Sequence, residues 1–355
     1  METRYLTIRR EAPDEEIMQI AAALLREGRL VAFPTETVYG LGANGLDCAA
    51  VKAIYLAKGR PSDNPLILHI AKPEDAARLA REINANARAL MAAFWPGPLT
   101  LVLPRRDSVP DAVTGGLDSV AIRLPNCPVA RRLIELAGVP IAAPSANTSG
   151  RPSPTTAQAV IDDLAGRIDA VLDGGPCGIG LESTVVDCTT PVPTILRPGG
   201  ITREQLEAVL GEVEIDAALT QPKETPRSPG MKYKHYAPKA PLFLFEGEAE
   251  ATAAALLAEV KAALGRGEKV GALVDETTAL LLPQETVTVC YGPRGDIKAA
   301  AARLYTALRS FDRQAVAVIY ATGVAEDGLG LALMNRLRKA SGYQIRCIKG
   351  GVDHG

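Results

Sequence analysis

Short apolar runs alternate with longer helical patterns along most of the chain, and this alternation restricts the fold more than any other feature. Residues 66–70 (LILHI) and 119–125 (SVAIRLP) are typical of β-strands, whereas residues 14–28 and 49–58 have helical patterns. The first helix is expected to end at Gly28, since glycine is common at helix C-termini. The loops contain many Pro, Ser, Thr, Asn and Gly residues. We therefore expect an α/β fold with a functional site in its loops.

A second region of strand and helix alternation begins at residue 241. Its predicted helices are 250–264, 296–309 and 327–340, and strand-like runs precede and separate them. Strands alternating with helices of this length predict a parallel sheet with covering helices. Residues 213–239 lack periodicity, and positions 221–239 hold five Lys or Arg residues against one Glu. We therefore predict a first domain over 1–212, a linker over 213–239 and a second domain over 240–355.

The composition is that of an ordinary globular protein. The chain of 355 residues is 47% hydrophobic and 23% charged, with a formal net charge of −2, which argues against holding nucleic acid by bulk charge. Its start lacks the apolar segment of a signal peptide, and no apolar run has the length of a membrane span. The six cysteines contain no C-x-x-C pair, and the three histidines lack metal-ligand spacing. We expect a cytoplasmic protein with reduced cysteines, no membrane association and no protein-held metal site.

Two familiar motifs do not fit their surroundings. Residues 40–45 (GLGANG) match the dinucleotide-binding pattern, but that pattern needs its first glycine directly after a strand, and residues 34–39 intervene. We interpret the match as a chance feature of a glycine-rich loop. Ser145 follows an apolar run and His69 could be its base, yet no G-x-S-x-G turn surrounds the serine. A serine hydrolase is therefore disfavoured.

Four cationic residues lie at the ends of predicted elements, and each alone would be an ordinary surface charge. Together they suggest a cleft for a polyanion and a carboxylate, because arginine binds both groups through paired hydrogen bonds and lysine acts as a point charge on phosphate. The pattern predicts positioning and charge neutralisation on a metal-bound triphosphate. The cations are Lys58, Arg60, Arg123 and Arg197, and the nearby polar residues are Ser62, Asn64, Ser145, Asn147, Ser153, Ser183 and Thr184.

Residues 228–238 (SPGMKYKHYAP) are punctuated like a linker, but they also contain three aromatic rings and two lysines. A segment that only joins two domains is usually built of small or solvated residues. We therefore expect it to fold over the cleft, with His235 or Tyr236 reaching the nucleotide and Lys232 or Lys234 its phosphates. The alternative is a static junction packed between the domains.

Seven ordered blocks resemble the YrdC-like domain of threonylcarbamoyl-AMP synthases. The segment 228–238 and the α/β tail resemble the longer, two-domain form of that family, so the resemblance covers essentially the whole chain. It implies a first domain with a twisted mixed sheet and a concave basic face, followed by a Rossmann-like domain that binds no dinucleotide. The blocks are FPTETVYGLG (33–42), KGRPSDNPLILHI (58–70), WPGPLTLVL (95–103), VAIRLP (120–125), APSANTSGRPSPT (143–155), ESTVVD (182–187) and ILRPGGI (195–201).

The resemblance implies an activity. The family condenses L-threonine, bicarbonate or CO2, and ATP into threonylcarbamoyl-adenylate and pyrophosphate. A partner transferase then passes the threonylcarbamoyl group to an adenosine next to the anticodon of tRNAs that read codons beginning with A. ATP would be a substrate, Mg²⁺ would be held mainly by its phosphates, and no organic prosthetic group is implied.

The resemblance also assigns roles to residues. Lys58, Arg60, Ser145 and Asn147 would be catalytic; Lys58, Ser62, Asn64, Ser119, Ser145, Ser153, Arg197, His235 and Tyr236 would bind ATP; Thr35, His69, Arg123 and Ser183 would bind threonine, with Arg123 on its carboxylate. Two alternatives stay open. One is a hydrogenase-maturation carbamoyltransferase, whose acylphosphatase and zinc-finger regions this chain lacks. The other is a non-catalytic RNA-binding protein that uses the concave basic face, and weak RNA contact is also compatible with an enzyme.

Overall fold

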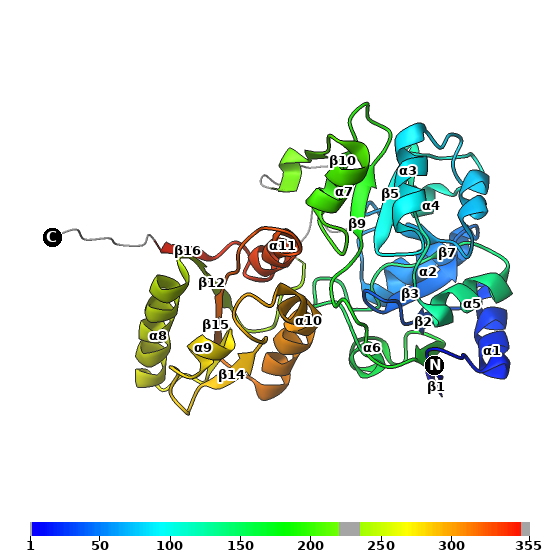
Figure 1. Cartoon of the computed structure of the whole chain (residues 1–355). Helices are drawn as coiled ribbons and strands as arrows, with labels where there is room; N and C mark the ends of the chain where they lie inside the picture. The colour runs from blue at the N-terminus through cyan, green and yellow to red at the C-terminus, as the bar shows by residue number, and fades with distance from the viewer. Residues whose placement is uncertain (1, 220–234, 349–355) are drawn as a thin grey trace. The chain divides into compact units, whose positions relative to one another are not determined.

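The computed structural model describes residues 2–219 and 235–348 (Figure 1). It divides into two compact units, which are described separately: Met1–Ser149 with Ser153–Tyr233, and Gly150–Pro152 with Lys234–Gly355. The first unit contains a mixed sheet and the second a parallel one. The predicted α/β class is therefore confirmed, including the parallel sheet of the second part.

In the described residues of the first unit, one sheet of eleven strands organises the fold, and parallel and antiparallel neighbours are interspersed in it. For example, β4 pairs with β6 in parallel and with β7 antiparallel. The order across the sheet is β1 (Arg4–Thr7), β8 (Ala170–Asp173), β2 (Val31–Phe33), β3 (Gly40–Asn44), β7 (Ile141–Ala142), β4 (Ile67–His69), β6 (Ser119–Arg123), β5 (Leu99–Pro104), β9 (Thr184–Asp187), β10 (Thr194–Arg197) and β11 (Glu214–Ile215).

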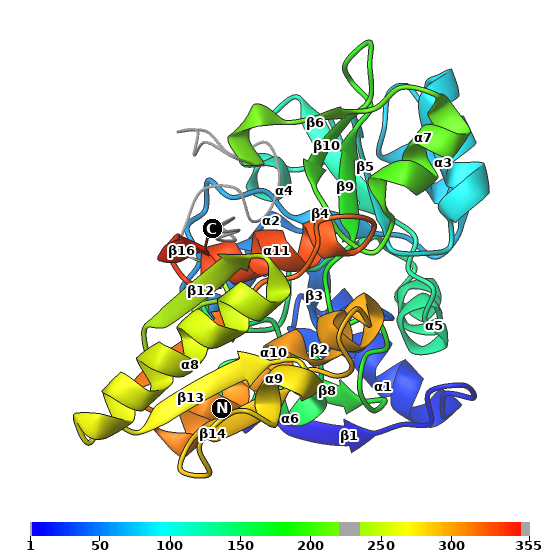
Figure 2. The ribbon, with the colours of Figure 1, turned by 60° about the vertical axis from the view of Figure 1, so that its left-hand side comes forward.

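Helices cover this sheet unequally. On one face, α1 and α5 pack over the end formed by β8, β2 and β7, where Val31, Phe33 and Leu172 are buried (Figure 2). On the opposite face, the alternate residues Ala32 and Val171 join a larger core that includes α2, α3 and α6. The helices of this unit are α1 (Glu15–Arg26), α2 (Cys48–Lys58), α3 (Ala85–Phe94), α4 (Asp111–Thr114), α5 (Pro128–Ala137), α6 (Ala157–Leu164) and α7 (Arg203–Leu210), with 3-10 turns η1 (Pro73–Arg78) and η2 (Ala217–Leu219).

The remaining strands of the first unit leave part of one face free of a helical core. Residues such as Leu68, Leu101 and Ile122 belong to the large core on the helix-covered side. Because side chains alternate along a strand, their neighbours point the other way. On the face opposite the large core, strands alone contribute the buried apolar residues, which are Ile67, Val102, Ala121, Val185 and Leu196. This strand-lined face is where polar side chains of the same strands can meet a ligand.

The glycine-rich segment 40–45 corrects the sequence interpretation of a loop. Its first five residues form β3, which pairs antiparallel with β2. A β-carbon on Gly42 would lie 2.8 Å from the Phe33 ring and 2.9 Å from the Ile141 side chain. This glycine therefore allows close packing inside a sheet, and it is not part of a phosphate-binding turn.

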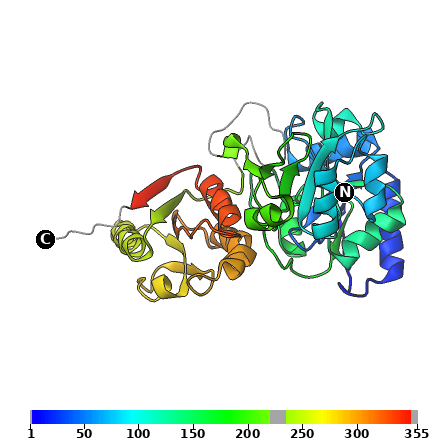
Figure 3. The same cartoon turned by 45° about the horizontal axis from the view of Figure 1, so that its top comes forward.

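Residues 235–348 of the second unit form a five-stranded sheet in which every neighbouring pair is parallel. Figure 3 shows α8 (yellow-green) on one side of the sheet and α10 and α11 (orange and red) on the other. The edge strand β16 was not predicted, because its sequence IRCI alternates too weakly to be distinguished from a loop. The elements are β14 (Val287–Cys290), β13 (Val270–Val274), β15 (Val318–Thr322), β12 (Leu242–Gly247) and β16 (Ile345–Ile348), with α8 (Ala249–Gly265), α9 (Glu276–Ala279), α10 (Ile297–Gln314) and α11 (Gly330–Ala340). Across the described parts of both units, no helix has the length and apolarity that crossing a membrane requires.

Candidate active site

Three loops of the first unit hold one another in place through backbone hydrogen bonds. The Tyr39 N–H donates to the Pro154 carbonyl at 2.9 Å, and the Ala146 N–H donates to the Tyr39 carbonyl at 2.8 Å. The Ile179 N–H donates to the Glu36 carbonyl at 2.9 Å. The three loops that contain residues 36–39, 146–154 and 179 thus form one structure. They carry the predicted site residues Thr35, Ser145, Asn147, Ser153 and Ser183.

Lys58 is fixed by the end of α2. The helix starts at its N-cap Asp47 and stops at Gly59, whose φ of 61° is left-handed, so Lys58 is the last helical residue. Its ammonium donates to the carbonyl oxygens of Ser145 and Asn147, both at 2.5 Å. The Ser145 hydroxyl donates to Asn147 Oδ1 at 2.5 Å. The structure therefore brings these three predicted catalytic residues together.

The burial of Lys58 corrects one expectation from the sequence. A lysine beside a Gly- and Pro-rich loop was treated as an exposed charge, yet Lys58 is only 1% exposed. Its aliphatic stem is covered as the helix packs on the sheet, and carbonyl oxygens take the place of water around the ammonium. Replacing Lys58 will therefore affect the fold as well as any ligand.

The loop after α2 places Arg60, Ser62 and Asn64 differently from one another. The Arg60 guanidinium donates to the carbonyls of Asn64 and Pro65 at 3.3 and 3.2 Å. Ser62 is exposed, whereas Asn64 is buried. The side-chain oxygen Oδ1 of Asn64 accepts no hydrogen bond from the described residues. This buried amide oxygen is therefore a candidate acceptor for a ligand donor.

Three polar residues form a row across adjacent strands. His69 in β4 is opposite Arg123 in β6, and Arg123 is opposite Thr100 in β5. Residues in register on neighbouring strands point to the same face, here the face that strand residues alone line. Burial, together with the nearby positive charge of Arg123, lowers the pKa of His69 to about 3. The imidazole is therefore neutral at physiological pH, and it can recognise a ligand hydroxyl without adding charge.

Arg123 already has a carboxylate neighbour within the protein. Glu36 Oε1 lies 2.8 Å from Arg123 Nη2, and both side chains are largely buried. The Arg123 Nε–H also faces the Gly97 carbonyl at 3.4 Å. Reading the sequence did not single out Glu36. The sequence feature that could have indicated Glu36 is an acidic residue inside the first family block, between two threonines and followed by an apolar strand.

Ser183 and Arg197 are joined at the start of β9 and the end of β10. The Arg197 guanidinium donates to the Ser183 carbonyl from Nε and to its hydroxyl from Nη2, both at 3.1 Å. The Ser183 hydroxyl is also 2.8 Å from the Thr100 hydroxyl. Glu182, which precedes Ser183 in the sequence, accepts a hydrogen bond from the Ser153 hydroxyl at 2.6 Å. Thr100 and Glu182 are polar members of this region that the sequence analysis did not assign.

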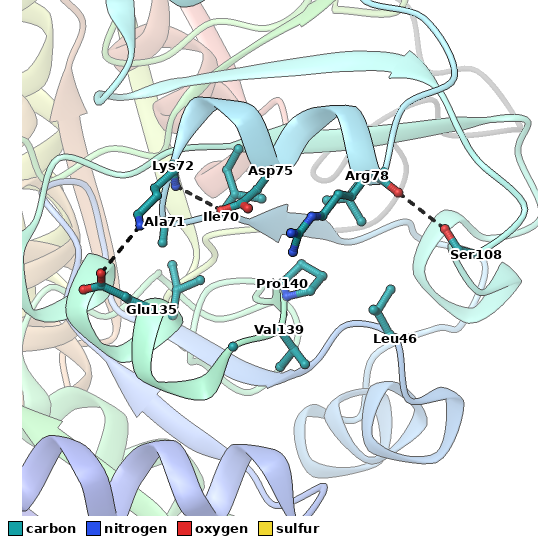
Figure 4. A pocket seen from close by; sticks show the side chains of 13 residues that line it. Leu46, Ile70, Ala71, Lys72, Asp75, Arg78, Ser108, Glu135, Val139 and Pro140 are labelled. Atoms are coloured by element: carbon teal, nitrogen blue, oxygen red, sulfur yellow. Dashed lines mark hydrogen bonds and ion pairs between the residues drawn. The ribbon is translucent and has the colours of Figure 1, made fainter.

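Ser119 lies at the opposite end of β6 from Arg123. It begins β6, whereas Arg123 ends it, so the two are about 13 Å apart at roughly 3.3 Å per residue. Ser119 lines a different hollow of about 320 Å³ together with Arg81 and Asp187. A larger pocket of about 340 Å³ contains none of the predicted site residues (Figure 4). Its Lys72 ammonium is 3.9 Å from the carboxylate of Glu135, so that cation is already compensated.

His235 and Tyr236 belong to the second unit, and Lys232 and Lys234 lie outside the described residues. Within the second unit, the Tyr236 ring stacks on Tyr305 with centroids 5.4 Å apart. The Arg336 guanidinium lies 5.5 Å from the centroid of the Tyr236 ring. Tyr236 is 5% exposed and has a φ of 63°, so tertiary packing holds it in a conformation uncommon for tyrosine. The contact of His235 or Tyr236 with the nucleotide stays a prediction.

Fold and site together define an α/β enzyme with buried cationic, hydroxyl and imidazole groups on the strand-lined face of its sheet. The family model described as "Telomere recombination" matches residues 23–199, and the model described as "Threonylcarbamoyl-AMP synthase, C-terminal domain" matches residues 201–342. The chain belongs to the threonylcarbamoyl-AMP synthase family.

Individual relatives match along most of their length. The threonylcarbamoyl-AMP synthase of Bacillus subtilis is 52% identical over 94% of each chain. That of Pyrococcus abyssi is 51% identical over 95% of this chain and 97% of its own. The crystal structure of P. abyssi Sua5 complexed with L-threonine superposes with a TM-score of 0.93, 49% identity, and coverage of 98% of this chain and all of that one.

These relatives confirm the family resemblance, the twisted mixed sheet, and the prediction of a nucleotidyl-transferring enzyme that makes threonylcarbamoyl-AMP and uses ATP as a substrate. They give no support to a non-catalytic RNA-binding protein. A hydrogenase-maturation carbamoyltransferase is also disfavoured, because the two threonylcarbamoyl-AMP synthases match 94% and 95% of the chain.

Proposed function

We propose that this chain forms L-threonylcarbamoyl-adenylate on the strand-lined face, with each substrate held by a separate cluster of residues. Arg123 would bind the carboxylate of L-threonine, and His69, Thr35 and Ser183 would complete its pocket. The observation that carries this assignment is the buried row of His69, Arg123 and Thr100, since a guanidinium can bind a small carboxylate through paired hydrogen bonds.

ATP would occupy the loop side of the same region. The amine of threonine takes up bicarbonate or CO2 to give a carbamate, and a carbamate oxygen forms a bond to the α-phosphorus while the bond to pyrophosphate breaks. Lys58, Arg60 and Arg197 would offset the charge that builds on the phosphate oxygens. Ser62, Asn64, Ser119, Ser145, Asn147 and Ser153 would supply hydroxyl and amide contacts, and His235 and Tyr236 would close the site over the nucleotide.

Mg²⁺ would enter with the triphosphate. Among the described residues no group of three or more His, Cys, Asp and Glu side chains is arranged to hold a metal. Mg²⁺ is commonly bound through substrate phosphates and one or two carboxylates, which suits this donor set. Glu182, which accepts a hydrogen bond from Ser153, is the carboxylate on the predicted ATP side. When bound, the ion would neutralise charge on the phosphates.

The product would pass to a tRNA-modifying transferase. An acyl-adenylate is reactive toward water, so a partner that consumes it promptly is expected in the cytoplasm. Direct contact with RNA would be weak, since the net charge of −2 provides little general attraction for nucleic acid.

Pyrophosphate release from ATP tests the proposal. The protein is incubated with Mg²⁺ and ATP in four mixtures: with both threonine and bicarbonate, with either alone, and with neither. We expect rapid release only in the complete mixture. Equal release in all four mixtures would show a simple ATPase, and no release in any would contradict the proposed activity.

A further inference from the structure

Glu36 presents a buried carboxylate that the protein itself does not satisfy. Both carboxylate oxygens are inaccessible to solvent, and neither accepts a hydrogen bond of good geometry from the described residues. The Glu36 side chain is 14% exposed and that of Arg123 is 5% exposed. Arg123 Nη2 is 2.8 Å from Oε1, but its N–H bonds are not aligned with that oxygen, and Oε2 has no donor in the described part of the chain.

Such an arrangement is unusual, because an ionised carboxylate can accept about four hydrogen bonds and a buried one normally does so. The Glu36 backbone is not free to move away, since its carbonyl accepts from Ile179 N–H and Thr35 is tied to Val38 by a 2.7 Å hydrogen bond. A ligand that enters beside Arg123 would supply the missing donors. A cationic donor would suit best, because hydrogen bonds between ionised partners are the strongest.

We propose that Glu36 binds the α-ammonium group of the amino-acid substrate and makes the site selective for a free zwitterionic amino acid. This inference rests on the proposed function, which places the substrate carboxylate on Arg123. The two ends of a zwitterion carry opposite charges a few ångströms apart, and Arg123 and Glu36 offer the complementary pair at a similar spacing. The ammonium would supply the donors that Oε2 lacks, while Arg123 turns its N–H groups to the substrate carboxylate.

Carbamate formation changes this contact. The reaction converts an ammonium and bicarbonate into a carbamate, water and a proton, so the positive charge next to Glu36 is replaced by a negative one. Glu36 then repels the new carboxylate, and this repulsion favours an orientation of the carbamate oxygen away from Glu36. Glu36 is thus a specificity residue for the entering amino acid.

A ligand pair separates this role from a purely structural one. L-threonine and its analogue with hydroxyl in place of the α-amine, (2S,3R)-2,3-dihydroxybutanoate, share the carboxylate and side chain and differ in the ammonium. We expect the wild-type protein to prefer threonine, and Glu36→Gln to bind threonine about 10- to 100-fold more weakly, as loss of a charge-assisted hydrogen bond predicts. Binding of the hydroxy acid should change less than about 3-fold. Glu36→Asp, which keeps the charge, should retain part of the preference for threonine.

Calorimetry with both ligands gives distinct outcomes. If Glu36→Gln weakens the binding of both ligands equally, Glu36 merely orients Arg123. If the preference for threonine is unchanged, the ammonium binds elsewhere. Either result overturns the inference. Glu27→Gln, the same change at an exposed residue, is the matched control and should leave both affinities unchanged. If the wild-type protein binds no threonine, the proposed function itself fails. If Glu36→Gln does not fold, Glu36→Asp is used instead. The inference is contradicted if Glu36→Asp binds both ligands more weakly while the ratio of its affinities for threonine and the hydroxy acid equals that of wild type.

Discussion

At the scale of single residues, Lys58 combines two roles that usually lie on different side chains. Its ammonium anchors the Ser145–Asn147 loop from inside the protein, and it is proposed to face phosphate. We expect Lys58→Ala to lower turnover by at least ~10²-fold, as loss of a charge partner in the transition state can. It should also lower the free energy of unfolding by about 1–3 kcal/mol, because two carbonyls lose a charged donor. Urea unfolding and turnover measure the two effects, with exposed Lys52→Ala as control. Unchanged stability would contradict the anchoring role.

The low pKa of His69 predicts how the stability of the protein depends on pH. Its pKa in the folded protein is about 3, against 6.5 for an unperturbed histidine. Below pH 6.5 the unfolded chain takes up a proton that the folded protein refuses, so His69 lowers stability progressively as the pH falls toward 3. His69→Asn lacks this proton uptake. Between pH 7 and pH 4.5, the stability of wild type relative to His69→Asn should fall by on the order of 2 kcal/mol in urea unfolding. A difference independent of pH would show that His69 titrates normally.

At the scale of elements, the strand register produces the substrate pocket. Arg123 is the last residue of β6 and is in register with His69 and Thr100, so its planar guanidinium is fixed in orientation. Arg123→Lys should weaken threonine binding by about 1–3 kcal/mol, because an ammonium cannot replace a two-pronged donor. Binding of a non-hydrolysable ATP analogue should change much less. Calorimetric titrations with both ligands check this, and equal losses for both would mean that the arginine is structural.

The close packing of β3 predicts that a larger side chain at Gly42 destabilises the protein. A β-carbon on Gly42 would overlap Phe33 and Ile141 at 2.8 and 2.9 Å, inside the sheet core. We expect Gly42→Ala to destabilise the protein by about 1–3 kcal/mol, the usual cost of overpacking. Gly178→Ala is the control, since a β-carbon there meets nothing within 4 Å. Thermal unfolding compares them; similar melting temperatures for the two variants would be inconsistent with this packing.

The sequence predicted elements with strong periodicity and missed those without it. Helices such as α1 and α2 and strands such as β6 were identifiable, and their ends placed Lys58 and Arg123 correctly at element boundaries. Sequence could not show that Gly40–Asn44 is a strand, because glycines carry no apolar alternation to reveal one. Nor could it show the Glu36–Arg123 contact, because 87 positions separate the two residues and only sheet topology brings them together.

At the scale of the whole molecule, the chain enters the second unit twice. Residues 150–152 belong to that unit, although Ser149 and Ser153 on either side belong to the first. In this segment Arg151 donates to the Asp312 carboxylate at 2.8 Å, and the same carboxylate also accepts from the Lys239 N–H at 2.7 Å. Asp312→Ala should therefore lower turnover several-fold, because Asn147 and Ser153 flank the released segment. The exposed Asp327→Ala is the control. Steady-state turnover with folding checked by circular dichroism measures this, and wild-type turnover would show that the Arg151–Asp312 ion pair does not influence Asn147 and Ser153.

Isotope transfer tests most directly whether the protein joins threonine, bicarbonate and ATP in one product. The protein is given ATP, Mg²⁺, L-threonine and ¹³C-bicarbonate, and the products are analysed promptly by mass spectrometry. We predict an adenylate that contains threonine and exactly one ¹³C atom, formed with an equal amount of pyrophosphate and absent when threonine is omitted. AMP or ADP formation without any ¹³C-labelled adenylate would contradict the account.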